Sequence, residues 1–274
     1  MMKSKLILIT GASSGIGAEM AKQFAQQGHT LLLLARNQQA LEKVSSEIKL
    51  SGGQAHYYPA DVGEYEQVKT ISDTIKQTHG TPDVIINNAG SGLWRFIEET
   101  SYEDILANIK APYLAAAYMT KAFMPEMLER NSGHIVNMTS IAAKMPFSGA
   151  TTYVASRKAM IGLHEALTMD LHGTGIKTSL SYFAKVESSF WKNNPGSEER
   201  LPLAQKLIPI INTQKAASAI VQGVAKGRRD ITAPIMIRIL LFLNWLTPPI
   251  TKLIMHATGY KRQTSNKPSQ NHPD

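Results

Sequence analysis

The chain has 274 residues, of which 43% are hydrophobic, and this is enough for one large α/β domain with a sizeable core. It contains no cysteine, which excludes a disulfide framework and a thiolate zinc site and fits a reducing compartment such as the cytoplasm. The net charge of +8 lies entirely in residues 201–274, which hold ten Lys or Arg and two Asp, so we expect an anionic surface as a partner of this last quarter.

A glycine-rich turn near the amino terminus predicts a nucleotide-binding site. Residues 6–9 have the length of one buried strand, too short for a signal peptide, and a helical spacing of apolar residues begins at Ile16. Between these elements Gly11 allows a tight turn, Gly15 lets the backbone approach a diphosphate, and Gly17 lets the helix pack closely. An ordinary glycine turn is the alternative, but the strand–turn–helix context favours a phosphate bound at the helix N-terminus.

A second buried strand, residues 31–34, ends close to Arg36. In a dinucleotide-binding fold this strand end faces the adenosine ribose, where an acid binds the 2′-hydroxyl of NAD and an arginine accommodates the 2′-phosphate of NADP. No Asp or Glu occurs between Glu19 and Glu42, so the sequence favours NADP over the alternative of a solvated surface arginine.

Helices of ten or more residues alternate with short apolar strands through the next 150 or so residues. This alternation predicts an α/β fold with a single Rossmann-type, doubly wound parallel sheet and helices on both faces. Pro112 and Pro125 are expected to bend or split the longest helix. The expected strands are residues 54–58, 83–86, 134–138 and 176–182, and the expected helices are 38–50, 65–78, 102–130 and 153–173.

Several motifs, taken together, resemble the classical short-chain dehydrogenase/reductase family over about residues 5–190. They are the Thr-Gly-x-x-x-Gly-x-Gly run at 10–17, Asp61 with Val62, the Asn-Asn-Ala-Gly run at 87–90, Asn108, Ser140 and Tyr153. The resemblance implies hydride transfer between NADP(H) and a carbonyl or secondary alcohol. We therefore expect a small-molecule substrate, no nucleic acid partner, and a homodimer or homotetramer. The residues that the resemblance assigns to cofactor binding are Gly11, Ser13, Ser14, Gly15, Ile16, Gly17, Arg36, Asp61, Val62, Asn88, Ala89, Gly90, Tyr153, Arg157, Val186 and Ser188.

The same resemblance assigns catalytic roles. It makes Tyr153 the general acid in reduction, Ser140 the hydrogen bond that polarises the substrate oxygen, and Asn108 the holder of a water in a proton relay. A tyrosine side chain ionises near pH 10 in water and needs a nearby cation to act near neutrality. The family has lysine four residues after the tyrosine, whereas this chain has Arg157 there and Lys158 one place further. A residue four positions further along a helix lies on nearly the same face. We therefore expect Arg157 to take the place of that lysine and Lys158 to point away from Tyr153. A backbone slip that presents Lys158 is the alternative.

Two hypotheses on function follow, because arginine keeps the positive charge but does not readily release a proton. The first is an active NADP-dependent carbonyl reductase or alcohol dehydrogenase, which the intact Ser140 and Tyr153 favour. The second is an NADP(H)-binding protein with weak or lost catalysis that serves as a sensor or scaffold. A further departure bears on recognition of the nicotinamide carboxamide. The family usually has Pro-Gly where this chain has Phe183 and Ala184, and threonine where it has Ser188.

The remaining third of the chain covers the substrate and extends the domain. By resemblance, residues 188–211 form a variable flap, whose apolar side chains either line the substrate site or merely pack the flap on the sheet. The expected wall consists of Phe183, Phe190, Trp191 and Leu201. We divide the chain into a catalytic domain over 1–233, an apolar, basic helical extension over 234–260 and a disordered polar tail over 261–274. The catalytic domain should end with a helix capped by Thr213 and a last short strand over 230–233.

The apolar run at 235–246 is about half the length needed to span a bilayer, so we expect it to lie peripherally on a membrane surface. Phe242 and Trp245 would anchor it, and a lipophilic carbonyl substrate would then arrive from the bilayer. The alternatives are that this segment packs on the chain's own substrate site or on a second subunit. The flanking cations are Arg228, Arg229, Lys252, Lys261 and Arg262.

Overall fold

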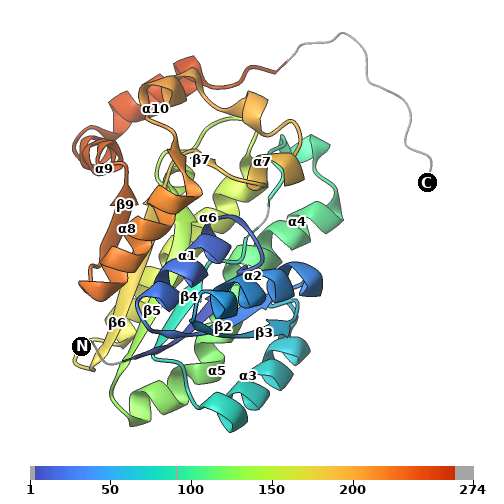
Figure 1. Ribbon diagram of the computed structural model, residues 1–274. Coiled ribbons are helices and arrows are strands. Elements are labelled where there is room, and N and C mark those ends of the chain that lie inside the picture. The colour runs from blue at the N-terminus through green and yellow to red at the C-terminus, as the bar shows by residue number, and fades with distance from the viewer. Residues whose placement is uncertain (1–3, 91, 263–274) are drawn as a thin grey trace.

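The computed structural model describes residues 4–90 and 92–262 (Figure 1). Seven parallel strands form one sheet in the order β3-β2-β1-β4-β5-β6-β9, which confirms the predicted doubly wound architecture. The chain order reverses between β1 and β4, the place where such sheets bind ligands at their carboxyl edge. The strands are β1 (Leu6–Thr10), β2 (Thr30–Ala35), β3 (Gln54–Pro59), β4 (Val84–Asn87), β5 (Gly133–Ser140), β6 (Ile176–Phe183) and β9 (Asp230–Ala233).

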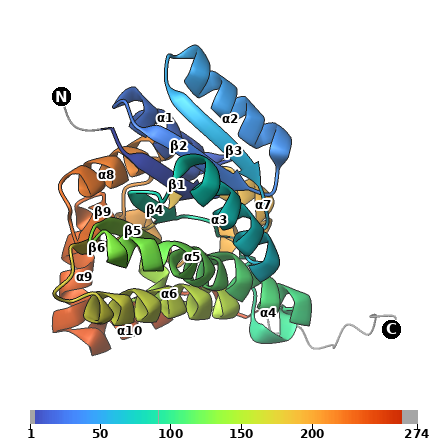
Figure 2. The ribbon, with the colours of Figure 1, turned by 90° about the horizontal axis from the view of Figure 1, so that it is seen from below.

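Helices cover both faces of the sheet, as Figure 2 shows from below. Because side chains alternate along a strand, Ile7 and Ile9 of β1 pack into one core layer and Leu8 between them into the other. The first layer is closed by α1 (Gly15–Gln26), α2 (Gln38–Leu50) and α8 (Thr213–Ala225), and the second by α3 (Tyr65–His79) and α5 (Ala115–Glu129). The helix α6 (Thr151–Asp170) lies beside α5 on the second face.

Two local predictions differ from the structure. The long helix expected over 102–130 is divided into α4 (Tyr102–Ile109), a π-helical turn (Lys110–Leu114) and α5. Pro112 lies in that turn, whereas Pro125 lies inside α5, which continues to Glu129, so only the first proline coincides with a break. The cap of α8 was predicted one residue too late, because the Asn212 side chain, and not that of Thr213, accepts the capping bond from the backbone of Lys215 at 2.9 Å.

The flap and the residues after β9 lie above the carboxyl edge of the sheet (Figure 1). The flap contains α7 (Phe190–Asn193) and two short 3₁₀ helices, η4 (Glu198–Arg200) and η5 (Leu203–Leu207), and a two-stranded ladder joins β7 (Val186–Glu187) to β8 (Ile211–Asn212). After β9, α9 (Met236–Leu246) and α10 (Pro248–Thr258) meet at a bend of 116°. Within the described ranges no single helix has the length and apolar character to cross a membrane, but α9 and α10 pass that test as a bent pair. Of the predicted tail, residues 263–274 lie outside the described residues.

Candidate active site

A cavity of about 700 Å³ opens at the carboxyl edge of the sheet, where residues that follow β1, β2, β3, β4 and β6 come together. This volume is typical of a site for a small ligand. Every residue that the sequence assigned to cofactor binding or catalysis lines this cavity, with the exception of Asn108. The predicted site is therefore one continuous surface in the structure.

The turn between β1 and α1 has a shape that requires glycine. Gly11 and Gly15 have φ angles of 67° and 58°, in the left-handed region that other residues rarely adopt. A Cβ atom on Gly17 would lie 2.2 Å from the carbonyl oxygen of Gly11, so this glycine lets α1 pack directly on the turn. The side chain of Ser14, the N-cap of α1, makes no capping hydrogen bond, which leaves the first N–H groups of the helix to a ligand in the cavity. This cradle fits the diphosphate of a dinucleotide.

The far end of the cavity is formed by the ends of β2 and β3. Arg36 is exposed directly after β2 and lines this end together with Asp61 and Val62. The Asp61 carboxylate accepts the backbone N–H of Gly63 at 2.9 Å, which fixes its direction. A cationic side chain therefore lies at the position where the sequence predicts the 2′-phosphate.

Asn88, which follows β4, stabilises the glycine turn. Its Nδ2 donates to the carbonyl oxygens of Thr10 at 2.9 Å and Gly11 at 3.2 Å. The Asn88 backbone N–H, in turn, donates to the Thr10 hydroxyl at 3.0 Å. The amide protons of Asn88 are thus used within the protein, and the residue shapes the cradle through its contacts with β1.

Ser140 and Tyr153, the predicted proton donors to substrate oxygen, line the same cavity. Ser140 ends β5, and its Oγ accepts the backbone N–H of Ala142 at 3.2 Å. Its only contact as a donor within the described residues is a long one, 3.5 Å to the Phe183 carbonyl, so the hydroxyl proton is available to a ligand. Tyr153 lies in the first turn of α6, which begins at Thr151, two residues earlier than predicted.

Arg157 lies beside Tyr153 and is almost fully buried, with 8% of its surface exposed, whereas Lys158 points outward. The centre of the Arg157 guanidinium is 5.0 Å from the centroid of the Tyr153 ring, a cation–π contact. The guanidinium also lies against Gly90, where a Cβ atom would lie 2.5 Å from a terminal nitrogen. The predicted helical geometry therefore holds, and the lysine position of the family is occupied by a stacked guanidinium.

Asn108 lies behind the cavity wall and does not line the cavity. It is buried near the end of α4, directly before the π-helical turn, and its Nδ2 donates to Thr152 Oγ1 at 2.8 Å. Its Oδ1 is buried without a protein partner among the described residues. A Cβ atom on Gly92 would lie 2.5 Å from this oxygen and 2.8 Å from the Tyr153 ring, so the two side chains flank Gly92. The relay role assigned to Asn108 stays a prediction.

An aromatic wall faces Tyr153. Its centre is Trp94, 6% exposed, whose ring centroid is 5.3 Å from that of Tyr153, 5.0 Å from Phe147, 5.3 Å from Trp191 and 6.4 Å from Phe190. The sequence pointed to the flap aromatics but missed Trp94 and Phe147. The position of Trp94 just after the 87–90 motif, at the carboxyl end of a strand, was the available signal.

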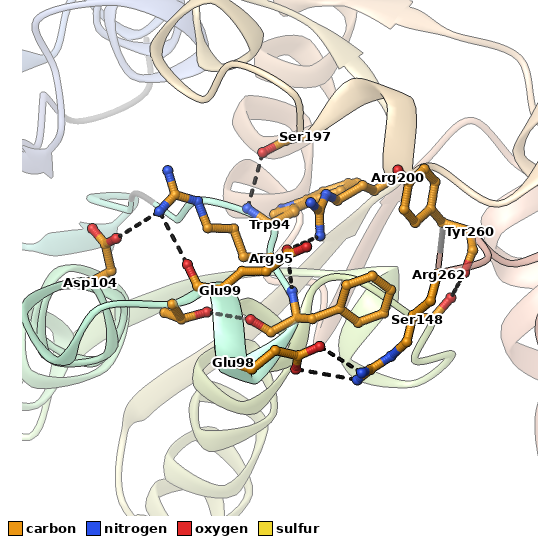
Figure 3. A network of polar contacts seen from close by, with 12 residues as sticks. Trp94, Arg95, Glu98, Glu99, Asp104, Ser148, Ser197, Arg200, Tyr260 and Arg262 are labelled. Carbon is orange, nitrogen blue, oxygen red and sulfur yellow. Dashed lines mark hydrogen bonds and ion pairs between the residues drawn. The ribbon is translucent and has the colours of Figure 1, made fainter. Parts of the chain in front are cut away.

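Arg200 joins the flap to the loop that carries Trp94 and to Tyr260 (Figure 3). It pairs with Glu99 at 2.7 Å, and its guanidinium lies 5.3 Å from the ring centroids of both Phe96 and Tyr260. Burial disfavours the Glu99 carboxylate, but the hydrogen bonds from Arg200 and from the backbone of Phe96, together with the charges of Arg200 and Arg95, outweigh burial and hold the pKa of Glu99 below its usual value.

A second ion pair fastens the end of α10 to the same loop. Arg262 pairs with Glu98 at 2.6 Å, and Figure 3 shows it beside the Arg200 pair. The backbone N–H of Trp94 donates to Ser197 Oγ of the flap at 3.0 Å. We refer to the pairs Arg200–Glu99 and Arg262–Glu98 as the C-terminal clasp, because they tie the flap and the residues after α10 to the loop that carries Trp94.

Comparisons with known proteins agree with this geometry. The family model described as short chain dehydrogenase matches residues 5–198. The chain is 29% identical to human 17-beta-hydroxysteroid dehydrogenase 13 over 255 residues, 92% of this chain and 82% of that one. It is also 29% identical to the fatty acyl-CoA reductase of Acinetobacter baylyi over 256 residues, 93% and 84% of the two chains. A short-chain dehydrogenase/reductase from Burkholderia phymatum, solved with NAD, superposes with a TM-score of 0.80 at 25% identity and covers 91% of this chain and 96% of its own.

The chain therefore belongs to the short-chain dehydrogenase/reductase family, a family of oxidoreductases that use nicotinamide dinucleotides.

Proposed function

We propose that this protein is an NADP(H)-dependent reductase or dehydrogenase that acts on a lipophilic carbonyl compound or the corresponding secondary alcohol. The observation that carries the proposal is the common cavity, in which Ser140 and Tyr153 face the aromatic wall.

The choice of NADP rests on Arg36. It is the cationic side chain at the end of β2. No Asp or Glu lies between Glu19 and Glu42, so no acid is present there to bind the 2′-hydroxyl of NAD. The glycine cradle supports a diphosphate between this end and the catalytic end, because Gly17 brings α1 onto the turn.

Bound NADPH supplies a hydride to the carbonyl carbon. Ser140 donates its free hydroxyl proton as a hydrogen bond to the substrate oxygen and so orients the carbonyl. Tyr153 transfers its phenolic proton to the same oxygen, which yields the alcohol, and regains a proton from solvent. Arg157 stabilises the negative charge that the phenolate carries in between, since the guanidinium is stacked on the Tyr153 ring. In oxidation the same residues act in reverse.

The lipophilic substrate class rests on the wall around Tyr153. Trp94, Phe147 and Trp191 present ring faces and edges to the space next to the phenol. Two relatives carry names for substrates with a large apolar part, a hydroxysteroid and a fatty acyl-CoA, which supports a lipophilic substrate here.

The test is Tyr153→Phe in the full chain, assayed for NADPH oxidation with steroid ketones, long-chain aldehydes, acyl-CoA thioesters and small polar ketones. Removing a general acid slows turnover by roughly 100-fold or more, while NADPH binding, followed by fluorescence, should be unchanged. Full activity in Tyr153→Phe would refute the assigned role. NADPH binding by the wild type without turnover of any carbonyl would favour the sensor or scaffold hypothesis instead.

A further inference from the structure

The apolar residues of α9 face outward, the reverse of an ordinary surface helix. Ile235, Ile239, Phe242 and Leu246 recur at spacings of three or four residues and are all exposed. Of the α9 residues, only Ile237 is fully buried. The stripe that a helix of this amphipathic kind normally turns to the core is thus presented to the outside.

The same holds for α10 and continues into the flap. Ile250, Leu253 and Ile254 of α10 are exposed, whereas Thr251 and Met255 form its buried side. The short helix η5 lies against α10 and exposes two leucines of its own. We call the exposed apolar side chains of α9, α10 and η5 the docking face. An exposed apolar surface shared by three helical segments is a sign of a missing partner.

The charges on these elements point to one kind of partner. Arg238 of α9, Lys252 of α10 and Lys206 of η5 are exposed on the same elements, and the only acid between residues 201 and 262 is Asp230, which precedes α9. A symmetric contact with a second copy of the chain would bring the same cations of both copies together. An apolar layer with negative charges at its boundary complements the docking face better than a second copy of the chain does.

We propose that the docking face binds an anionic phospholipid surface. Phe242 and Trp245, 58% and 74% exposed, are side chains of the type that occupies the level of the lipid headgroups. Arg238, Lys252 and Lys206 then meet the anionic headgroups, each strengthening binding by a factor of about five. Arg228 and Arg229, which the sequence suggested as contributors, precede β9, at the opposite edge of the sheet from the start of α9, and have no part in this contact.

The docking face adjoins the candidate active site. Gln205 of η5 lines the cavity while Leu203 and Leu207 of the same short helix are exposed outside. The C-terminal clasp fastens the flap and the residues after α10 to the loop that carries Trp94 (Figure 3). A bilayer bound to this face lies next to the flap, so an apolar substrate reaches the cavity without crossing water. The entry of substrate from the bilayer rests on the proposed function, whereas the binding of the docking face to lipid is independent of it.

The experiment is sedimentation of the full chain with sucrose-loaded vesicles of phosphatidylcholine alone or with one-third phosphatidylglycerol. We expect binding to the anionic vesicles, at least a tenfold loss in the variant Phe242→Ser/Trp245→Ser, and a similar loss in Lys206→Gln/Arg238→Gln/Lys252→Gln. All five side chains are exposed, so the fold is retained. The matched control is Leu50→Ser/Met169→Ser, which removes two side chains that are 89% and 76% exposed on α2 and α6 and should bind as the wild type does.

Two results would overturn the proposal: no sedimentation of the wild type with anionic vesicles, or binding by Phe242→Ser/Trp245→Ser that equals that of the wild type. If the wild type does not bind lipid and the variant loses the native oligomer, the face belongs to a contact with a second copy. Activity of all variants with a water-soluble carbonyl is measured in parallel, so a failure of docking and a failure of the proposed chemistry are seen separately.

Discussion

Arg157 differs from a lysine in shape more than in charge. Its flat guanidinium lies beside both the Tyr153 ring and Gly90, where an added Cβ atom would be 2.5 Å from a terminal nitrogen. A Gly90→Ala substitution pushes the guanidinium away from its place beside the ring, so the cation stabilises the phenolate less. We expect turnover to fall about tenfold, which corresponds to about 1.4 kcal/mol in the activation free energy. Arg157→Lys alone should leave turnover unchanged or raise it, because an ammonium keeps the charge.

The double variant Gly90→Ala/Arg157→Lys is the decisive measurement. An ammonium on a slender stem leaves room for the added methyl group, so the loss in Gly90→Ala should be largely restored. Steady-state kinetics with NADPH check this. If the two effects simply add, the contact between Gly90 and Arg157 is unimportant, and a complete loss in Arg157→Lys alone would show that the stacked arginine is required.

Arg36 is the second residue whose chemistry decides a property of the whole enzyme. Its removal in Arg36→Ala takes away a charge-assisted hydrogen bond to the 2′-phosphate, which typically contributes about 1.5–3 kcal/mol. We expect NADPH affinity to fall about 10- to 100-fold. NADH lacks the phosphate and serves as the internal control, with unchanged affinity. Equal affinity for both cofactors in the wild type at low salt, or a preference retained in the variant, would remove NADP from the proposal.

At the scale of elements, the flap is held from outside by the C-terminal clasp. Arg200→Gln breaks the ion pair with Glu99 and the stacking on Tyr260, so η4 loses its ion pair with the loop that carries Trp94 and is joined to that loop through the Ser197–Trp94 hydrogen bond. We expect KM for a bulky apolar carbonyl to rise several-fold, with NADPH affinity unchanged, and proteolysis within the flap to become faster. The matched control is Arg95→Gln, which breaks the pair with Asp104 on the same side of the site and leaves the flap attached. Equal kinetics of the two variants would show that the clasp does not support the flap.

The sequence predicted the elements far better than their contacts. The periodicity of apolar residues and the glycines between strands and helices gave the sheet and most helix bounds, and α2 agrees residue for residue. Motif spacing placed Ser140 and Tyr153 at one edge of the sheet. The sequence did not predict the conformations of the loops or the contacts between them. Trp94 and Phe147 come from two different loops, and the contact of Arg200 with Tyr260 joins residues sixty positions apart. Such contacts depend on tertiary packing, which local sequence patterns do not encode.

At the scale of the whole molecule, charge and polarity divide along the chain. Residues 1–200 are electrically neutral and build most of the sheet and the catalytic groups, whereas the last quarter carries the whole excess of +8. The structure gives this division a spatial meaning, because the outward apolar stripes of α9 and α10 follow the last strand and lie beside the flap. Chemistry and the proposed surface attachment are thus on different segments that the clasp connects.

Acid sensitivity of the fold is also a property of the whole molecule. His134 lies within β5, buried between β4 and β6, with its Nε2 2.7 Å from Ser179 Oγ. Burial, aided by the charges of Lys5 and Lys177, lowers the pKa of His134 to about 4 from its ordinary value near 6.5. The folded protein therefore keeps this ring neutral while the unfolded chain takes up a proton. The resulting stability is complete above about pH 6.5 and is lost as the pH falls towards 4, by about 1.4 kcal/mol for each pH unit in that window.

The prediction is tested with urea unfolding of the wild type and of His134→Gln at pH 7.5, 6 and 5. Glutamine has an amide that can hydrogen-bond Ser179 and no group that titrates. The variant should therefore lose less stability than the wild type between pH 6 and 5, by close to the 1.4 kcal/mol per pH unit that corresponds to one proton. The matched control is His172→Gln, which makes the same substitution at an exposed histidine. An identical slope in His134→Gln and wild type would show that His134 is protonated in the folded protein, and the acid sensitivity would then belong to other groups, of which the less buried His164 has a lowered pKa for the same main reason, burial.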